Sequence, residues 1–269
     1  LGEATKTVSY TMCKSKSYEF TLTWGAETST DDAEGVVTRQ SDIRPSDEDI
    51  DWALAQFRGV IDQVPPDFSA IKIKGVRAFD LARQAGADQT LPVLKPREVR
   101  IDQFFRLESD QAGARFFVTS GQGAYIRALA RDLGRTLGSA AHVTSLRRLS
   151  VGQFHIDHAI SLDFLEKLTH SSAAFEHLHP VVSVLDDIPA LPISRTEATK
   201  LRHGQALPVL SAIAQKRFAM IMTGSTGIAI EGQTPVALVM LKAGAICPVR
   251  VLNLQRKPIG DLDVDHTEA

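Results

Sequence analysis

The stretch GQGAYIRALARDLGRTL, residues 121–137, carries the clearest structural signal in this 269-residue sequence. Its apolar residues recur with the 3.6-residue period of an α-helix, so it predicts an amphipathic helix over residues 125–137. The apolar stripe consists of Ile126, Leu129, Ala130, Leu133 and Leu137. A Gly-x-Gly segment precedes this helix, and its glycines let the backbone come close to a ligand at the helix N-terminus.

Three arginines lie outside the apolar stripe at intervals of four residues. Arg127 falls in the first turn, where the helix dipole slightly disfavours a cation. A carboxylate partner from elsewhere in the chain would explain this position, and a solvated surface arginine is the alternative. Arg131 and Arg135 follow on the face away from the stripe, and we expect them to face solvent or phosphate.

Alternating, β-forming segments predict strands at residues 18–24, 69–74, 99–107 and 114–119. The last two strands are joined by a turn at residues 110–113. Ser46, with Asp49 three residues later, predicts the capped start of a helix. The polar segment 25–35 is interpreted as a loop, and residues 76–85 as a short helix.

The texture of the sequence changes after about residue 180. Short strand-like runs at 217–222, 235–241 and 248–252 are separated by turns that contain glycine. We therefore expect an α+β domain over residues 1–180 and a small β-rich domain over residues 181–269. A chain in which 43% of the residues are hydrophobic has enough apolar material for both.

Charge is distributed unevenly along the chain, whose net charge is −2. Residues 67–150 carry 14 basic and 8 acidic side chains, whereas residues 1–66 carry 6 and 12. This basic block indicates a local phosphate-binding surface, and uneven surface charge is the alternative. No apolar run approaches the roughly 18 residues of a membrane span, and no secretory signal is visible, so we expect a cytoplasmic protein.

Sequence motifs for cofactor or metal chemistry are missing. The sequence has no glycine-rich phosphate loop, no CxxC pair, no HExxH and no GxSxG, and its closest histidines, His155 and His158, have no cysteine nearby. We therefore expect a mechanism without metal or cofactor. Tyr18 follows a lysine at a strand entry, where it could stack on a base or simply serve as a strand residue. At least one of the adjacent Arg147 and Arg148 is expected to be available for phosphate or a carboxylate, and a solvated pair is the alternative.

Five segments resemble, in order and spacing, the bacterial tRNA pseudouridine-55 synthase (TruB) family. They are KSY at 16–18, GAETSTDDAEG at 25–35, RGVIDQVPPDFSAIKIKGVRAFDLAR at 58–83, GAYIRALARDLGRTLG at 123–138 and AHVTSLRRLSVGQF at 141–154. The resemblance covers about residues 1–165 and is weak beyond them. It implies a pseudouridine-synthase-like α+β fold, with a mixed, largely antiparallel sheet, flanking helices and a small β-rich, PUA-like C-terminal domain.

The resemblance also implies a function and a site. The function is a tRNA-modifying isomerase that flips uridine 55 out of the T-loop and converts it to pseudouridine without a cofactor. Its binding partner would be the T-arm of tRNA. The enzyme would be a monomer and would need no protein partner. Arg127 matches the arginine that pairs with the catalytic aspartate, and Tyr18 the tyrosine that stacks on the target base. Tyr125 and Leu146 match substrate-pocket positions, and Lys72 lies in an RNA-contacting region.

The sequence departs from the family pattern in several places. The motif Gly-x-Leu-Asp-Pro with the nucleophilic aspartate would precede residues 1–6, which are similar to the family segment that follows it, and it is absent. We therefore expect residues 1–269 alone to be inactive, and a non-catalytic tRNA-binding or tRNA-folding module is the alternative. Asp31 and Asp32 lie in a different family loop and are not interpreted as nucleophiles. Ala124 replaces the usual Thr, and Phe79 a frequent Tyr.

Two other enzyme classes are alternatives to this one. A guide-RNA-dependent pseudouridine synthase fits the continuous T-arm-family segments less well. A sugar-processing enzyme would need a pair of placed carboxylates, and the sequence offers no identifiable pair.

Overall fold

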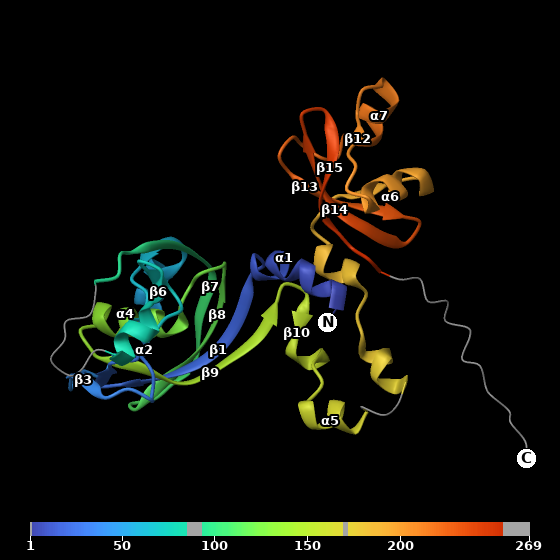
Figure 1. The fold of residues 1–269 in the computed structure, drawn as a ribbon. Coiled ribbons are helices and arrows are strands. Elements are labelled where there is room, and N and C mark those ends of the chain that lie inside the picture. The colour runs from blue at the N-terminus through green and yellow to red at the C-terminus, as the bar shows by residue number, and fades with distance from the viewer. Residues whose placement is uncertain (1, 85–92, 169–171, 255–269) are drawn as a thin grey trace, which may run out of the picture. The chain divides into compact units, whose positions relative to one another are not determined.

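The computed structural model describes residues 2–84, 93–168 and 172–254, which form two compact units (Figure 1). The large unit spans Met12–Glu166. The small unit combines the described residues before Met12 with those from Lys167 onward. All the site residues predicted from the sequence lie in the large unit. The functional division of the chain at residue 180 stays a prediction.

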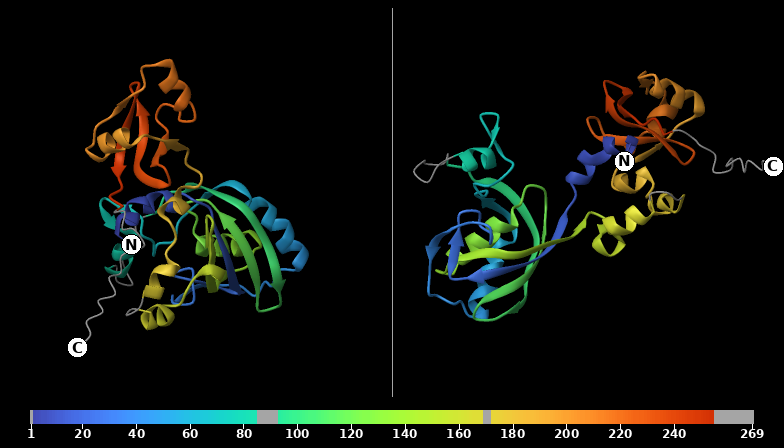
Figure 2. Two further views of the ribbon diagram at one scale, coloured as in Figure 1. Left: turned by 90° about the vertical axis from the view of Figure 1, so that its right-hand side faces the viewer. Right: turned by 60° about the horizontal axis from the view of Figure 1, so that its bottom comes forward.

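A six-stranded antiparallel sheet in the order β10-β9-β1-β8-β7-β4 forms the frame of the large unit (Figures 1 and 2). Two helices, α2 and α4, pack against it and share its hydrophobic core. The elements of this frame are β1 (Lys16–Trp24), β4 (Gly59–Gln63), β7 (Arg97–Ser109), β8 (Gly113–Ser120), β9 (Ala141–Val151), β10 (Phe154–His155), α2 (Asp47–Leu54) and α4 (Ile126–Thr136).

Two small hairpins and short helices complete this unit. The hairpins pair β2 (Ala26–Thr28) with β3 (Val37–Gln40), and β5 (Lys72–Ile73) with β6 (Val76–Arg77). The helices are α3 (Ala78–Gln84), which follows β6, and α5 (Leu162–Lys167), at the boundary of the two units. A further helix, α1 (Val8–Met12), precedes β1.

Strand alternation builds the core of the large unit. Phe20, Leu22 and Trp24 share one face of β1 and are buried beneath the helices. Phe20 stacks on Phe116 of β8, with ring centroids 5.3 Å apart. Tyr18 continues the same row toward the start of the strand and packs against the edge of this core. The strand period therefore directs Tyr18 to the helix-covered face.

Two of the three helix predictions for the large unit are confirmed. The Ser46 hydroxyl accepts a hydrogen bond from the Asp49 N–H, and the Asp49 carboxylate accepts one from the Ser46 N–H. Helix α4 begins after Tyr125 and buries the predicted apolar stripe, apart from the half-buried Leu137.

Other sequence predictions need correction. The polar segment 25–35 contains β2, the strand expected at 69–74 shortens to β5, and the helix expected at 76–85 starts only at Ala78. Ala85 itself lies outside the described residues. Residues 217–222 form no strand. Phe218 and Ile221 instead reach the core of the small unit from a helix end and the turn behind it, where their burial overrides their strand pattern.

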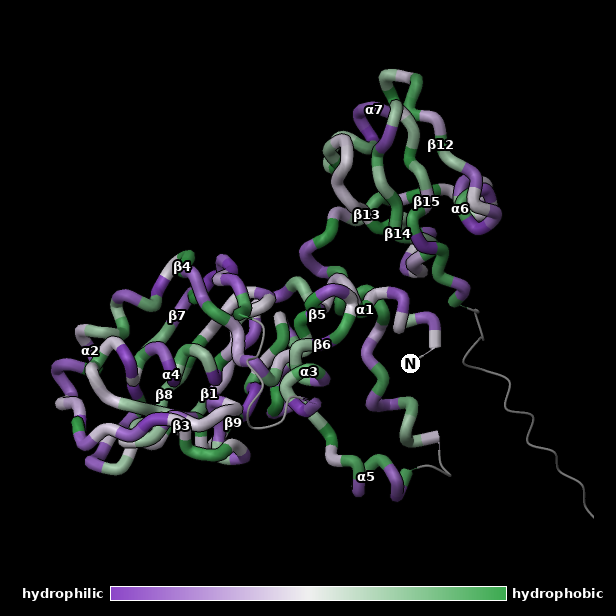
Figure 3. The backbone as a smooth tube through the Cα atoms, turned by 60° about the vertical axis from the view of Figure 1, so that its left-hand side comes forward, coloured by the Kyte–Doolittle hydropathy of each residue, from purple (hydrophilic) through white to green (hydrophobic). Residues whose placement is uncertain are grey.

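The small unit contains a five-stranded sheet in the order β11-β13-β14-β15-β12, with a parallel β11–β13 pair and antiparallel pairs elsewhere. The tube of its central strand, β14, is mostly green, that is hydrophobic, in Figure 3. The elements are β11 (Ala190–Pro192), α6 (Arg195–Arg202), β12 (Leu207–Pro208), α7 (Ala212–Arg217), β13 (Thr226–Glu231), β14 (Thr234–Lys242) and β15 (Ala245–Val251). The predicted α+β fold with a β-rich C-terminal part is thus confirmed.

Within the described ranges, no helix combines the length and the apolar character that a membrane span requires.

Gly134 provides a test of how closely α4 packs against β9. A Cβ atom at Gly134 would lie 2.9 Å from both the backbone nitrogen and the Cβ atom of Ala141. Gly134→Ala improves helix propensity by about 1 kcal/mol but overpacks this contact by about 1–3 kcal/mol. We expect a net loss of unfolding free energy, measured by urea denaturation with fluorescence of the two tryptophans, Trp24 and Trp52, which both lie in the large unit. Thr136→Ala, at an exposed position of α4, is the control and should not destabilise; stabilisation by Gly134→Ala would contradict the packing.

Candidate active site

Three arginines of α4 each pair with a carboxylate from β2 or from the loop of residues 29–36 that follows it. The N–O distances are 2.9 Å for Arg127–Asp32, 2.8 Å for Arg131–Asp31 and 2.7 Å for Arg135–Glu27. Residues four apart share a helix face, so these pairs form a line along α4. We call this line the ionic row and its members the first, middle and last pair.

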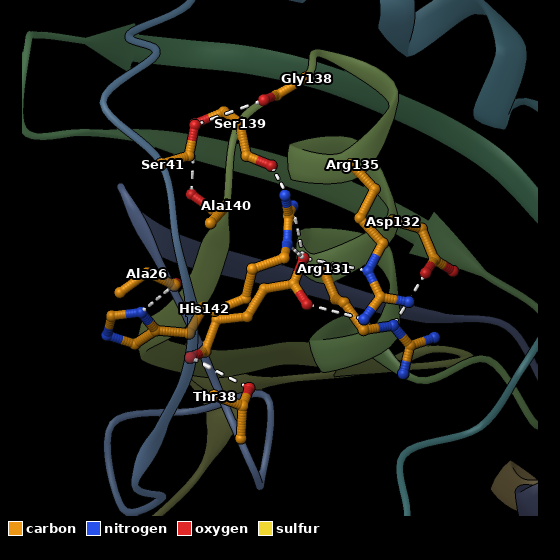
Figure 4. A network of polar contacts seen from close by, with 12 residues as sticks. Ala26, Thr38, Ser41, Arg131, Asp132, Arg135, Gly138, Ser139, Ala140 and His142 are labelled. Carbon is orange, nitrogen blue, oxygen red and sulfur yellow. Dashed lines mark hydrogen bonds and ion pairs between the residues drawn. The ribbon is translucent and has the colours of Figure 1, made fainter.

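The last pair anchors the row where α4 ends (Figure 4). Glu27 is buried and accepts two hydrogen bonds from Arg135 and two from Arg39. Burial acts to raise the pKa of Glu27, but the hydrogen bonds from Arg135 and Arg39 outweigh it, so the pKa is lowered. Arg39 also donates a hydrogen bond to the backbone oxygen of Ser139. The Nδ1 atom of His142 lies within hydrogen-bond distance of the backbone oxygen of Ala26. The β2–β3 hairpin is thereby tied to the turn after α4.

The middle pair is the most enclosed. The side chains of Arg131 and Asp31 are 8% and 10% exposed, so the expectation that Arg131 faces solvent or phosphate is wrong. The loop of residues 29–36 and that of residues 64–71 cover the outward face of the helix here. Arg131 also donates to the Asp132 carboxylate, at 2.9 Å, and to the backbone oxygen of Val64, at 2.7 Å. Burial raises the pKa of Asp31 to about 6, against the opposing charge of Arg131.

The first pair lies at the accessible end of the row. The side chains of Arg127 and Asp32 are 24% and 25% exposed. One terminal nitrogen of Arg127 donates to Asp32 and to the backbone oxygen of Thr30, and the other donates to that of Phe68. These contacts use three of the five N–H groups of the guanidinium. The other two N–H groups have no acceptor among the described residues, and they remain available to a further anion.

The start of α4 is fixed by a residue that the sequence did not reveal as part of the site. Gln63, at the end of β4, is 1% exposed. Its side-chain oxygen accepts from the Tyr125 N–H at 2.8 Å, and its nitrogen donates to the Tyr125 oxygen at 3.1 Å. Nothing in the local sequence distinguishes this buried glutamine from a surface one. Gly123 has φ of +90°, a backbone conformation that favours glycine. The conformational freedom expected of the Gly-x-Gly segment is therefore needed at this position, just before α4.

The register between β1 and β9 brings two predicted site residues to one face. Tyr18 lies opposite Arg148, and Phe20 lies opposite Leu146. Residues directly opposite each other share a face, so Leu146 and Arg148 lie on the same side as Tyr18. Leu146 is 46% exposed, which leaves an apolar surface beside the tyrosine. Arg147 lies opposite Glu19 on the other face, and the register therefore separates the two adjacent arginines.

Tyr18 is half-buried at this position. Burial raises the pKa of Tyr18, while the charge and a hydrogen bond of Arg148 oppose the shift. The side chain is therefore a neutral phenol at neutral pH, with a cation next to its hydroxyl.

Lys72 lies apart from these groups, on the β5–β6 hairpin. It is exposed and lies opposite Arg77. Phe79 follows in α3, where the guanidinium of Arg83 lies 4.5 Å from its ring centre. Ala124 packs against the edge of the core. Within the described parts of the chain, no group of three or more His, Cys, Asp or Glu side chains is arranged to hold a metal ion.

The pKa of Asp31 makes the stability of the large unit depend on pH. A carboxyl whose pKa rises from 3.8 to about 6 on folding stabilises the fold below pH 4, and this contribution is lost as the pH rises through 6. The advantage of wild type over Asp31→Asn should therefore shrink by about 2–3 kcal/mol between pH 4 and pH 7.5. Urea denaturation followed by tryptophan fluorescence measures it. An advantage that grows with pH would show that Arg131 lowers the pKa of Asp31.

The chain matches the models of two known protein domains and is similar to several named proteins. Residues 1–126 match the model of the TruB family pseudouridylate synthase N-terminal domain, and residues 127–188 match that of the tRNA pseudouridylate synthase B C-terminal domain. A protein of Rhodospirillum rubrum named tRNA pseudouridine synthase B is 43% identical over 254 residues, which cover 94% of this chain and 81% of the relative. A protein of Bradyrhizobium diazoefficiens with the same name is 44% identical over 260 residues, covering 94% and 72%.

Solved structures show the same fold. The crystal structure of a Cbf5-Nop10-Gar1 complex gives a TM-score of 0.65 at 20% identity, covering 94% of this chain and 70% of the matched chain. An H/ACA RNP bound to a substrate RNA containing 2′-deoxyuridine gives 0.65 at 18% identity, covering 96% and 71%.

These relatives decide between two of the expectations drawn from the sequence. Named synthases that match 94% of the chain do not favour a non-catalytic module. The inference that residues 1–269 are inactive on their own is not borne out by them. The two domain models together cover more than half of the chain, and so the chain belongs to the TruB family of pseudouridine synthases.

Proposed function

We propose that this protein converts uridine 55 in the T-loop of tRNA to pseudouridine, using residues of the large unit. The observation that carries the proposal is the first pair. Asp32 and two backbone carbonyls hold Arg127 at an accessible position, and two of its N–H groups have no acceptor among the described residues. The names of the relatives support tRNA as the substrate.

Isomerisation breaks the N-glycosidic bond, turns the base and rejoins it through C5. The uridine must first leave its stack, at a cost of roughly a few kcal/mol. A carboxylate next to the flipped nucleotide then acts as nucleophile or assists departure of the base. The guanidinium of Arg127 keeps this carboxylate ionised and orients it.

Asp32 does not fit the part of that carboxylate. One of its oxygens accepts from the Thr30 hydroxyl and the Glu34 N–H, and the other accepts from Arg127. These bonds fix Asp32 and weaken it as a nucleophile. The family motif Gly-x-Leu-Asp-Pro is absent from the 269 residues. We therefore assign Asp32 to holding Arg127, and not to nucleophilic attack.

Tyr18 and Leu146 form the wall of the base pocket in this proposal. The phenol ring of Tyr18 stacks on the uracil, and its oxygen lies where it can help to move the C5 proton. Leu146 provides apolar contact on the same face. Tyr125 closes the pocket from the start of α4, where Gln63 fixes its backbone. Positioning inside a closed pocket supplies the rate gain, so these residues need no metal or nucleotide.

Lys72 and its neighbours on the β5–β6 hairpin are proposed to hold the RNA backbone. Lys72, Lys74 and Arg77 are exposed and positively charged. Phosphate contacts of this kind release counterions, so RNA affinity should fall as the salt concentration rises. In this proposal the enzyme acts as a monomer in the cytoplasm and needs no protein partner.

Arg127→Ala tests the proposed role of the first pair. The change removes the cation that orients the nucleophile but leaves the basic hairpin intact. We expect the single-turnover rate to fall at least a thousandfold while the Kd for T-arm RNA changes by less than about threefold. Tritium release from RNA labelled at uridine C5 measures the rate. Arg115→Ala, on the other face of the sheet, is the matched control and should keep the wild-type rate. A rate for Arg127→Ala within tenfold of wild type would contradict the assignment.

Tyr18→Phe tests the role of the phenol. Phenylalanine keeps the stacking surface but cannot exchange a proton, so RNA binding should persist and tritium release should slow about a hundredfold or more. Because the pKa of Tyr18 is raised, action as a phenolate would make the wild-type rate climb about tenfold per pH unit through pH 8 and above. Tyr18→Phe should lose this rise. The same pH profile in both proteins would assign the C5 proton to another group.

A further inference from the structure

We propose that the middle pair, Asp31–Arg131, positions Arg127 and so controls the rate of isomerisation without touching the RNA. This inference rests on the proposed function of Arg127. Neither residue belongs to the site predicted from the sequence. From the sequence, Arg131 was expected to face solvent or phosphate.

Arg127 and Arg131 join the same three segments at two levels. Arg127 links α4 to the loop of residues 29–36 through Asp32 and to the loop of residues 64–71 through Phe68. Arg131 links α4 to the first loop through Asp31 and to the second through Val64. One helical turn separates the two levels. Because Arg131 makes a second set of contacts to both loops, the loops cannot rotate about their contacts with Arg127.

The backbone of the loop connects Asp31 to Asp32. Asp31 has φ of +59°, a left-handed conformation that residues other than glycine rarely adopt. Its N–H donates to the Thr28 oxygen and its own oxygen accepts from the Val143 N–H, both at 3.1 Å. With the backbone held on both sides, the Asp31 carboxylate turns toward Arg131 and the next carboxylate toward Arg127. Releasing the Asp31 side chain removes a constraint that keeps this turn in place.

The middle pair is more deeply buried than the first pair, and this difference indicates different roles for the two pairs. The side chains of the middle pair are 8% and 10% exposed, whereas those of the first pair are 24% and 25% exposed. RNA can therefore reach Arg127, and a change at Asp31 acts through Arg127. Arg131 keeps its contact with Asp132 when the Asp31 charge is removed, so its own charge is not left without a carboxylate.

Asp31→Asn tests the proposal with single-turnover tritium release at saturating T-arm RNA. We expect the rate to fall about 10- to 100-fold, because a misplaced catalytic group loses rate in that range, while the RNA Kd changes less than about twofold. Arg131→Lys keeps the charge but loses the forked geometry, and it should lower the rate less. Asp51→Asn is the matched control: it takes the same charge from an ion pair with Arg106 at the edge of α2 and should leave the rate unchanged.

The pH profile separates positioning from general loss of structure. The charged groups that face Asp31 are Arg131, Arg135, Arg127 and Asp132. Protonation of Asp31 below about pH 6 weakens the middle pair, so the wild-type rate should fall there with a limb that Asp31→Asn lacks. A wild-type rate that stays flat through pH 6, or a fall that Asp31→Asn shares, would contradict the positioning role.

A measurement independent of turnover makes the two proposals separable. The ¹⁵N resonance of the Arg127 Nε–H should shift in Asp31→Asn and stay unchanged in Asp51→Asn. A wild-type rate in Asp31→Asn together with an unshifted resonance overturns the positioning role. If wild type releases no tritium at all, the proposed function fails, and the Arg127 resonance still decides whether the middle pair positions that side chain.

Discussion

The arrangement of the site depends on three ion pairs along one face of α4, in which the middle pair and the carboxylate of the last pair are buried. A charge that is removed from water without a partner is strongly destabilising. In the ionic row each guanidinium meets a carboxylate, and backbone oxygens of Thr30, Val64, Phe68 and Ser139 accept further N–H groups from the row and from Arg39. The same bonds fasten two loops to the helix. The row is thus both the solution to an electrostatic problem and the frame that presents Arg127.

This frame is retained at some expense of stability. Burial raises the pKa of Asp31 to about 6, so ionisation of this carboxyl makes the fold less stable at neutral pH than at pH 4. Asp31 also adopts a backbone conformation that is unfavourable for a residue with a side chain. Local rules are typically broken at functional sites, where position matters more than stability. Both departures occur next to the residue that holds Arg127.

The sequence predicted those parts of the fold that local patterns determine. Helix α4, the Ser46 cap and the β7–β8 pair follow from periodicity and turn chemistry within short windows. Strand β9 was not anticipated, because residues 144–148 are exposed on both faces and show no alternation. The strand expected at 217–222 failed because tertiary burial of Phe218 and Ile221 outweighed it. Arg131 was misplaced because a helical pattern identifies the outward face but does not show which loops cover it.

The site was predictable only through the family resemblance. From periodicity alone, Arg127 and Tyr18 could each be either a site residue or an ordinary residue of a helix or strand. The partner of Arg127 comes from 95 residues away in the chain, and that of Arg131 from 100. Likewise, Leu146 and Arg148 share a face with Tyr18 because of the register between two distant strands. Such long-range pairings are set by the folded topology, and no short window of sequence contains them.

A double-mutant cycle on Asp31 and Asp32 tests the central claim, that the middle and first pairs act as one unit, most directly. The single-turnover rate would be measured for Asp31→Asn, Asp32→Asn and the double variant. If both residues act by orienting Arg127, the double variant should be no more than about threefold slower than the slower single variant. Losses that multiply in full would show that the two pairs act independently, and would contradict the account.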